Sequence, residues 1–162
     1  MSDHPTRTIV RTACLFDGER LRPTSAGPTD VVVEAGRVAA VVPADGALTP
    51  DVDVAFLMPG LVEAHAHIFL DGGELDFAVR TEYLKADVDT MVATARMNVE
   101  RTAAAGITLV RDAGDRWGIN DRIRGELAAD PAAPLRLRSP GLGVKRPKRY
   151  GGFMARDIGE GV

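Results

Sequence analysis

Cysteine and aromatic residues are scarce in this 162-residue chain, and each shortage excludes a class of chemistry. Cys14 is the single cysteine, so neither an internal disulfide nor a cysteine metal cluster can form. Aromatic residues make up 5% of the chain and the net charge is −3, so the stacking side chains and the positive field that nucleic-acid binding needs are both missing. We therefore expect no nucleic-acid partner.

Long apolar runs are also missing. No segment approaches the length of a membrane span, and the N-terminal MSDHPTRT has no apolar signal core. Hydrophobic residues make up 45% of the chain and charged residues 27%, which is ordinary for a globular enzyme. We expect a cytoplasmic protein with no membrane partner.

Two of the three histidines, His65 and His67, lie one residue apart in PGLVEAHAH (59–67). Side chains at positions i and i+2 of a strand point to the same side, so both imidazoles would face one way, as a pair of metal ligands requires. The alternative is that two histidines merely share a strand. Their concentration here favours the metal-ligand interpretation, since the one other histidine is His4.

The first third of the chain reads as short strands and turns. Residues 9–18 predict a strand that ends in an Asp-Gly turn, and residues 31–34 and 37–42 predict a β-hairpin with a tight turn between them. Residues 43–53 predict a turn-rich connector. This small sheet has modest apolar content, so we expect it to need further strands from elsewhere.

From residue 59 the pattern changes to strands that alternate with helices, which predicts parallel βα units. The predicted strands are 61–68, 107–114 and 135–139, and the predicted helices are 81–105 and 118–129, with a glycine-rich loop at 69–77. The longer helix carries one apolar stripe, formed by Leu84, Val88, Met91, Ala95 and Val99. Gly106 is placed to end it.

Three segments, VVVEAGRVAAVV (31–42), FLMPGLVEAHAH (56–67) and GITLVRDAG (106–114), resemble in this order the N-terminal part of the metal-dependent amidohydrolase superfamily. The family commonly has Asp where this chain has Glu63. The resemblance implies an α/β protein with two parts: residues 1–57 as an incomplete β-sandwich segment, and residues 58–162 as the first about three units of a (β/α)8 TIM-like barrel. It also implies His65 and His67 as ligands of one or two divalent ions, most simply Zn²⁺, with Mn²⁺ or Fe²⁺ as alternatives.

A complete barrel of this kind takes roughly 250 residues, so most of one is missing. The family's further ligands and its catalytic aspartate come from later strands, and no histidine follows His67. We expect this chain to contain no catalytic residue of its own. A complementing C-terminal barrel chain would supply the general-base aspartate in an obligate heteromer. A natural split, a cleaved precursor and a fragment of one longer polypeptide all remain open.

Four further residues are candidates for substrate binding. Asp112, at the end of a predicted strand, would contact substrate or orient a ligand, or else form a structural ion pair with Arg111. Lys145 and Arg146 belong to the glycine-rich segment 140–162, where Lys148 and Arg149 add two more positive charges. That segment would hold an anionic substrate, dock the complementing chain, or be a solvated loop.

The expected activity is hydrolysis of a C–N bond in an amide, cyclic amide or amidine-like group of a small-molecule or peptide-like substrate. A bound divalent ion would lower the pKa of water toward ~7, and the complementing chain's aspartate would accept its proton. The alternative is a non-catalytic metal-binding or structural subunit derived from such an enzyme.

Overall fold

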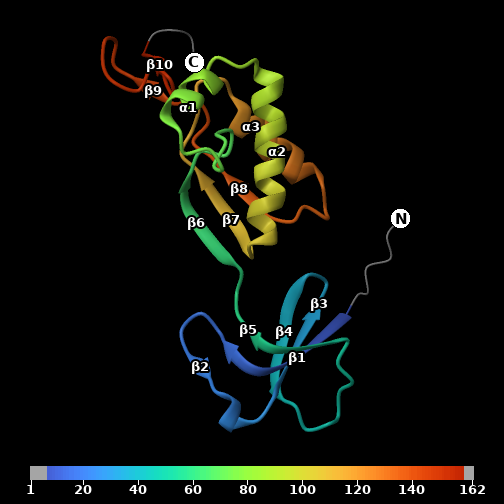
Figure 1. The fold of residues 1–162 in the computed structure, drawn as a ribbon. Helices are drawn as coiled ribbons and strands as arrows, with labels where there is room; N and C mark the ends of the chain where they lie inside the picture. The colour runs from blue at the N-terminus through green and yellow to red at the C-terminus, as the bar shows by residue number, and fades with distance from the viewer. Residues whose placement is uncertain (1–6, 159–162) are drawn as a thin grey trace. The chain divides into compact units, whose positions relative to one another are not determined.

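A computed structural model describes residues 7–158. The structure is of the mixed α/β class that the sequence predicts, and it divides into two compact units after Pro59 (Figure 1). The assignment of these units to a β-sandwich and to part of a barrel stays a prediction. Within residues 7–158, no helix combines the length and apolar character needed to cross a bilayer.

The first unit is one sheet of five strands within the described residues. The order is β2-β1-β3-β4 with antiparallel neighbours, and β5 runs parallel to β1. A short 3₁₀ helix lies at Thr24–Ala26. The strands are β1 (Arg7–Phe16), β2 (Leu21–Arg22), β3 (Thr29–Glu34), β4 (Arg37–Pro43) and β5 (Val52–Leu57).

Turn chemistry explains how the first unit is connected. Ala35 and Gly36 have φ angles of 48° and 73°, so the predicted hairpin is confirmed and closes through two residues of positive φ. Asp17 follows β1, and its Oδ1 accepts hydrogen bonds from the backbone N–H groups of Glu19 and Arg20. The connector predicted over 43–53 is wrong at its end, because Val52 begins β5. The pairing of β5 with β1 is a contact between segments about 40 residues apart, which local patterns do not reveal.

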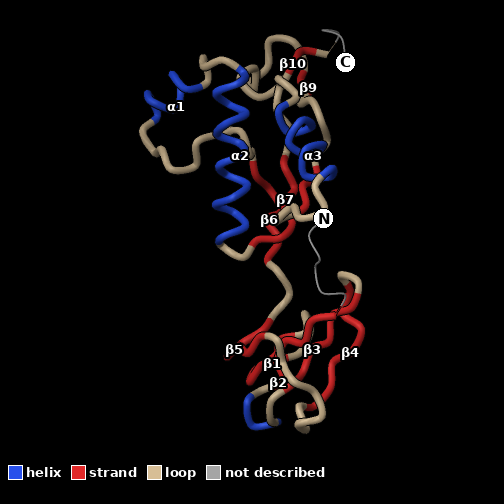
Figure 2. Tube along the Cα trace, turned by 90° about the vertical axis from the view of Figure 1, so that its right-hand side faces the viewer, coloured by secondary structure: helices blue, strands red, loops and turns tan. Residues whose placement is uncertain are grey.

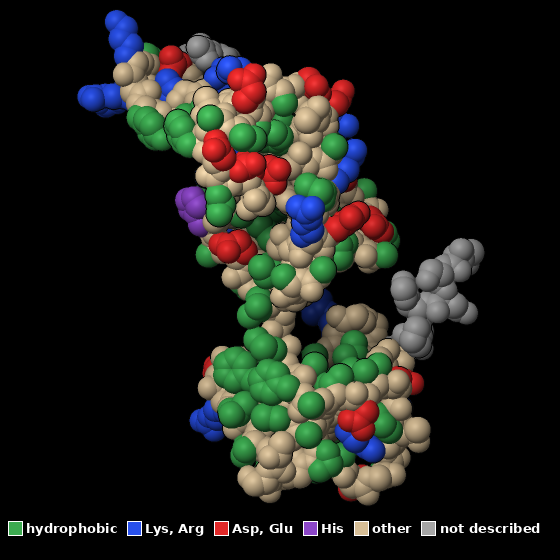
Figure 3. Space-filling model, viewed as in Figure 1, with side chains coloured by type: hydrophobic (Ala, Val, Ile, Leu, Met, Phe, Trp, Pro, Cys, Tyr) green, Lys and Arg blue, Asp and Glu red, His purple; other side chains and the backbone are tan. Residues whose placement is uncertain are grey.

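Large apolar side chains remain exposed on this unit, as Figure 3 shows. Val38 is 63% exposed, and Phe56 and Met58 are about half exposed. A shallow apolar groove is lined by Val10, Leu15, Phe16, Val31, Val33, Val38, Val41, Leu57, Met58 and Pro59. The sheet therefore buries too little of its own apolar surface, as expected of an incomplete unit.

The second unit contains a parallel three-stranded sheet in the order β6-β7-β8: β6 (Leu61–Ala66), β7 (Ile107–Asp112) and β8 (Arg136–Arg138). Two helices, α2 (Val88–Ala104) and α3 (Ile119–Ala129), lie on one face of it (Figures 1 and 2). All three predicted strands and the second predicted helix are confirmed. Between sheet and helices lies a continuous core that includes Phe69, Met91, Ala95, Val110, Ile119, Ile123 and Leu137.

The helix predicted over 81–105 is in fact two helices, α1 (Phe77–Tyr83) and α2. Asp87 causes the break, because its Oδ1 accepts a hydrogen bond from the backbone N–H of Thr90 at 2.8 Å and caps α2 there. Leu84 accordingly ends α1 and does not belong to the stripe of α2, whose buried residues are Met91, Val92, Ala95 and Val99. Gly106 ends α2 with a φ of 84°, as predicted.

The start of this unit requires a glycine, and its last segment contains two further short strands. A Cβ on Gly60 would lie 2.1 Å from Oγ1 of Thr108 on the neighbouring strand, so the Pro-Gly pair before β6 requires its glycine. In the segment predicted as an unstructured loop, two short parallel strands pair instead, β9 (Val144–Lys145) and β10 (Arg156–Asp157). They lie beyond the carboxyl ends of β6, β7 and β8 (Figure 1).

Candidate metal centre

The two histidines lie at the carboxyl end of β6, the end at which barrel enzymes place their chemistry. Their ring centroids are 5.4 Å apart, so both imidazoles lie on the same side of the chain, as the i, i+2 spacing predicts. His65 is exposed and His67 is half-buried. Figure 3 shows histidine side chains at the surface of the second unit, where an ion and water can reach them.

One hydrogen bond fixes the proton position on His67. Nδ1 of His67 lies 3.0 Å from the carbonyl oxygen of Gly114, an atom that can only accept. The proton of the neutral ring is therefore on Nδ1, and the lone pair is on Nε2. Histidine ligands in proteins commonly use this arrangement, in which a carbonyl or carboxylate holds one nitrogen while the other binds the metal.

The segment after His67 is held by hydrogen bonds from three elements. The backbone N–H of Ile68 donates to Oδ2 of Asp112 at 2.7 Å, and the Asn98 amide donates to the carbonyl oxygens of Ile68 and Leu70 at 2.9 and 2.7 Å. The Tyr83 hydroxyl donates to the carbonyl of Phe69, whose ring is fully buried. These contacts fix the position of the backbone that carries the His67 ring.

Asp112 has no exposed surface, and both its oxygens accept from backbone N–H groups: Oδ2 from Ile68, as above, and Oδ1 from Gly114 at 2.7 Å. Burial raises the pKa of this carboxyl, and the two backbone donors partly oppose that effect. Among the described residues the predicted ion pair with Arg111 does not form, because neighbouring strand residues point to opposite faces. The side chain of Asp112 has no exposed surface, and substrate contact by Asp112 stays a prediction. Through these two hydrogen bonds Asp112 connects the residue after His67, Ile68, to the segment that follows β7.

The other three predicted substrate residues lie in two places. Arg111 is exposed, on the face of β7 opposite to Asp112. Lys145 donates from Nζ to the Asp157 carboxylate and so ties β9 to β10, whereas Arg146 is exposed on the same segment. The four positive charges within residues 145–149 are therefore not equivalent, since Lys145 has a structural partner. Substrate binding by these residues stays a prediction.

A buried polar network near the ends of β7 and β8 is absent from the sequence-based candidates. Asp115 accepts hydrogen bonds from the backbone N–H groups of Trp117, Gly118, Ile119 and Asn120, and it thereby caps α3. The Asn120 side chain bonds to Asp115, to the carbonyl of Gly141 and to the Ser139 hydroxyl. An aspartate shortly before an apolar helical pattern is a capping signal, so the sequence could have indicated the role of Asp115. No local pattern indicates the hydrogen bond between Asn120 and Ser139, which are 19 residues apart.

His65 and His67 are ligand types that divalent ions use, but within residues 7–158 they are too few to bind one firmly. Two imidazoles converge, and one of them has the proton arrangement of a ligand. No group of three histidine, cysteine or carboxylate side chains close enough to bind one ion occurs in the described part of the chain. Structural and catalytic zinc sites use three or four protein ligands. A metal site of this kind would therefore need further donors besides His65 and His67.

The chain matches no known family profile and no characterised protein by sequence. Its fold does match solved structures: a prolidase complexed with N-methylphosphonate-L-proline (19% identity, TM-score 0.69), ochratoxinase from A. niger (17%, 0.67) and guanine deaminase from C. acetobutylicum (14%, 0.62). The matches cover 94%, 86% and 93% of this chain.

The chain has the fold of one part of these enzymes. They are members of the amidohydrolase superfamily that the sequence motifs resemble. The chain spans only 40%, 32% and 39% of their lengths, about a third of each. At these identities the likeness concerns the fold, and the activity of the whole protein has to be argued from the site.

Proposed function

We propose that this chain is the N-terminal part of a metal-dependent amidohydrolase that hydrolyses a C–N bond, and that a complementing chain completes the barrel and the site. The observation that carries the proposal is the His65–His67 pair at the carboxyl end of β6, with Nδ1 of His67 held by a carbonyl. The shared fold with enzymes that include a prolidase and a deaminase supports the reaction class.

His65 and His67 would hold the ion through neutral imidazole, and Zn²⁺ suits this donor type best, with Mn²⁺ and Fe²⁺ as alternatives. When bound, the ion would acidify a water molecule and polarise the carbonyl under attack. The chain's own residues orient the ligands: Gly114 sets the proton on His67, and Asp112 and Asn98 hold the backbone beside it. The general-base aspartate is assigned to the complementing chain, because Asp112 is buried away from the surface.

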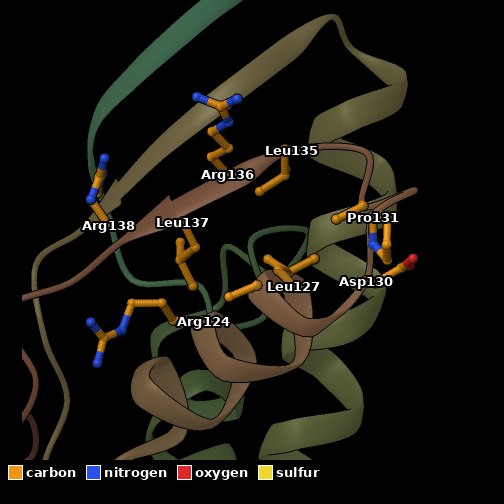
Figure 4. Close-up of a pocket in the computed structure, with 10 residues that line it drawn as sticks. Arg124, Leu127, Asp130, Pro131, Leu135, Arg136, Leu137 and Arg138 are labelled. Atoms are coloured by element: carbon orange, nitrogen blue, oxygen red, sulfur yellow. The ribbon is translucent and has the colours of Figure 1, made fainter. Parts of the chain in front are cut away.

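Completion by a further segment is supported by the open edge of β8, which pairs only with β7 among the described strands. Along that edge runs a groove between β8 and α3, with apolar lining from Leu127, Pro131, Leu135 and Leu137 and charged residues Arg124, Asp130, Arg136 and Arg138 around it (Figure 4). An unpaired strand edge next to apolar surface favours addition of another strand and helix. We infer that the next βα unit of the complementing chain occupies this groove.

Metal binding is tested in the assembled protein, that is, this chain together with its complementing segment. We expect about one or two equivalents of a divalent metal by elemental analysis and hydrolysis of amide or cyclic amide substrates. His65→Ala with His67→Ala should remove both metal and activity while assembly persists. Arg101→Ala, on an exposed side chain in the last turn of α2, is the control and should change neither. A double histidine variant that keeps its metal and full activity contradicts the proposal.

Completion is tested by producing the chain alone. With an open strand edge and exposed apolar surface, it should aggregate or lack a cooperative melting transition. A monodisperse chain that melts cooperatively by itself would rule out the open-barrel interpretation. Assembled protein that binds metal but hydrolyses no C–N bond would favour the alternative, a non-catalytic metal-binding subunit.

A further inference from the structure

The strand register places two arginines beside the histidines. Arg111 and Arg138 are partners on β7 and β8, and Ala66 is the partner of Asp112 on β6 and β7. Asp112 is buried on the face covered by the helices, so Arg111, its neighbour in the strand, points to the other face. His65 precedes Ala66, where the register between β6 and β7 shifts between Glu63 and Ala66. Arg111 and Arg138 therefore lie side by side on the face that no helix covers within residues 7–158, and His65 lies on the strand next to Arg111.

The direction of the β8 side chains is visible in Figure 4. Arg136 and Arg138 point to one side of the strand, and Leu135 and Leu137 point to the other side, toward α3. The burial agrees with this alternation, since Leu137 is buried and both arginines are exposed. The guanidinium of Arg138 thus belongs to the same open face as Arg111.

The acidic residue of β6 is Glu63, two residues before His65, and its Oε1 accepts a hydrogen bond from the backbone N–H of His65 at 2.8 Å. No carboxylate of residues 7–158 forms an ion pair with Arg111, Arg136 or Arg138, although most arginines of the second unit's helices do have such partners. Like charges on directly paired strand residues repel each other. An anion lying against two guanidinium groups held in register would relieve this repulsion, and each group can bind a carboxylate or phosphate in a bidentate way.

The spacing relates this anion to the metal ligands. Neighbouring strands are about 4.8 Å apart, so Arg111 lies about one strand and Arg138 about two strands away from His65. Two guanidinium groups at that range would bind an oxyanion separated by only a few covalent bonds from a carbonyl placed at the histidines.

We propose that Arg111 and Arg138 form an oxyanion subsite, so that the substrate is an acid whose carboxylate or phosphate group lies a few bonds from the scissile C–N bond. This inference rests on the proposed function, because it names the substrate class of the same site. It differs from the sequence-based expectation, which placed an anionic substrate on Lys145 and Arg146 and did not include Arg138.

The test compares three probes that share the group CH₃CO–NH–CH₂– and differ in the last substituent. They are N-acetylglycine (carboxylate), N-acetylaminomethylphosphonate (phosphonate) and the neutral N-acetylglycinamide. Binding to the assembled protein is measured by calorimetry. At least one anion should bind roughly tenfold or more tightly than the neutral amide, as expected for hydrogen bonds to a charged group. The better of the two anions identifies the oxyanion.

Arg111→Gln and Arg138→Gln should each remove most of this preference, while metal content stays unchanged. Arg136→Gln is the matched control, since Arg136 lies on the same face but two residues further from the carboxyl end, and it should keep the preference. Equal binding of all three probes by the native protein, or an unchanged preference in both variants, overturns the subsite. Loss of assembly in the two variants without any native preference would assign both arginines to ion pairs with the complementing chain, which also overturns it.

Failure of the subsite and failure of the proposed function are distinguishable. Metal binding and hydrolysis with no anion preference leave the proposed function standing and refute the subsite. An anion preference that depends on Arg111 and Arg138, in a protein that binds no metal and cleaves no probe, supports the subsite and refutes the proposed function.

Discussion

Both units bury aspartate side chains, and Asp30 of the first unit is stabilised in a different way from Asp112 of the second. Asp30 in the first unit is 1% exposed and forms two hydrogen bonds with the Arg11 guanidinium, at 2.7 and 2.8 Å. Asp112 in the second unit has no exposed surface and accepts only from backbone N–H groups. The pKa of Asp30 is lowered by its hydrogen bonds to Arg11, and the pKa of Asp112 is raised by burial.

The arginines of the two units also differ, in whether a carboxylate pairs with them. Arg11 has its carboxylate partner within its own sheet, whereas Arg111 and Arg138 have none within the described residues. In the first unit charge is thus neutralised internally, which is the behaviour of a structural element. In the second unit the buried acid accepts hydrogen bonds from the backbone, and the exposed Arg111 and Arg138 have no ion-pair partner within residues 7–158, as we propose for a binding site.

The largest effect is expected for Asp112→Asn. The amide can accept only through one oxygen, and its NH₂ group would face a backbone N–H, leaving a buried donor without a partner. We expect the free energy of unfolding of the assembled protein to fall by about 2–3 kcal/mol, measured by chemical denaturation. Metal affinity should fall as well, because the backbone beside His67 loses its anchor. A variant as stable as the native protein would show that Asp112 has no positioning role.

Asn98→Ala should have a smaller effect on the same segment. It removes two hydrogen bonds to partly buried carbonyls, those of Ile68 and Leu70, and should cost about 1–2 kcal/mol of stability. Metal affinity should fall by about tenfold, as for the loss of a group that orients a ligand. Metal titration of the assembled variant measures this, and Glu100→Ala, a substitution of an exposed side chain on the same helix, is the control. Equal affinities in both would limit Asn98 to stability.

Asp30→Asn tests the first unit through pH. Because the folded-state pKa of Asp30 is lowered, its carboxylate stabilises the fold above the unfolded-state pKa, and this contribution is lost as the pH falls through the folded value. The protection of the β1 and β3 amides against hydrogen exchange, relative to the intrinsic exchange rate at each pH, should therefore fall below about pH 4 in the native protein. In the Asn variant this protection should be lower at neutral pH and should depend less on acidification. The same pH dependence in both proteins would mean that Asp30 is not the titrating group.

The smallest difference is expected between Lys145→Ala and Arg146→Ala. Loss of the Lys145–Asp157 ion pair should loosen the pairing of β9 with β10 and increase proteolytic cleavage within 146–155. The exposed Arg146 should leave that cleavage unchanged, since no ion pair of its side chain is found within residues 7–158. If both variants raise the KM for an anionic substrate instead, the segment belongs to the site.

Local patterns predicted much of this fold for identifiable reasons. Alternation and turn chemistry located β3, β4, β6, β7 and β8, because Ala35-Gly36 and the apolar runs act over a few residues. The break between α1 and α2 was missed since the apolar stripe continued through it, while a single capping aspartate, Asp87, decided the outcome. The strand β5 and the pairing of β9 with β10 depend on partners distant in sequence.

By itself the sequence determined the two imidazoles on one side of a strand and the alternation of strands with helices, because both follow from periodicities of two and of about 3.6 residues. Only the tertiary structure decided that Asp112 lies behind the histidines and that Arg138 stands beside Arg111. Those relations depend on the register between strands, and register is set by the packing of the whole sheet against α2 and α3.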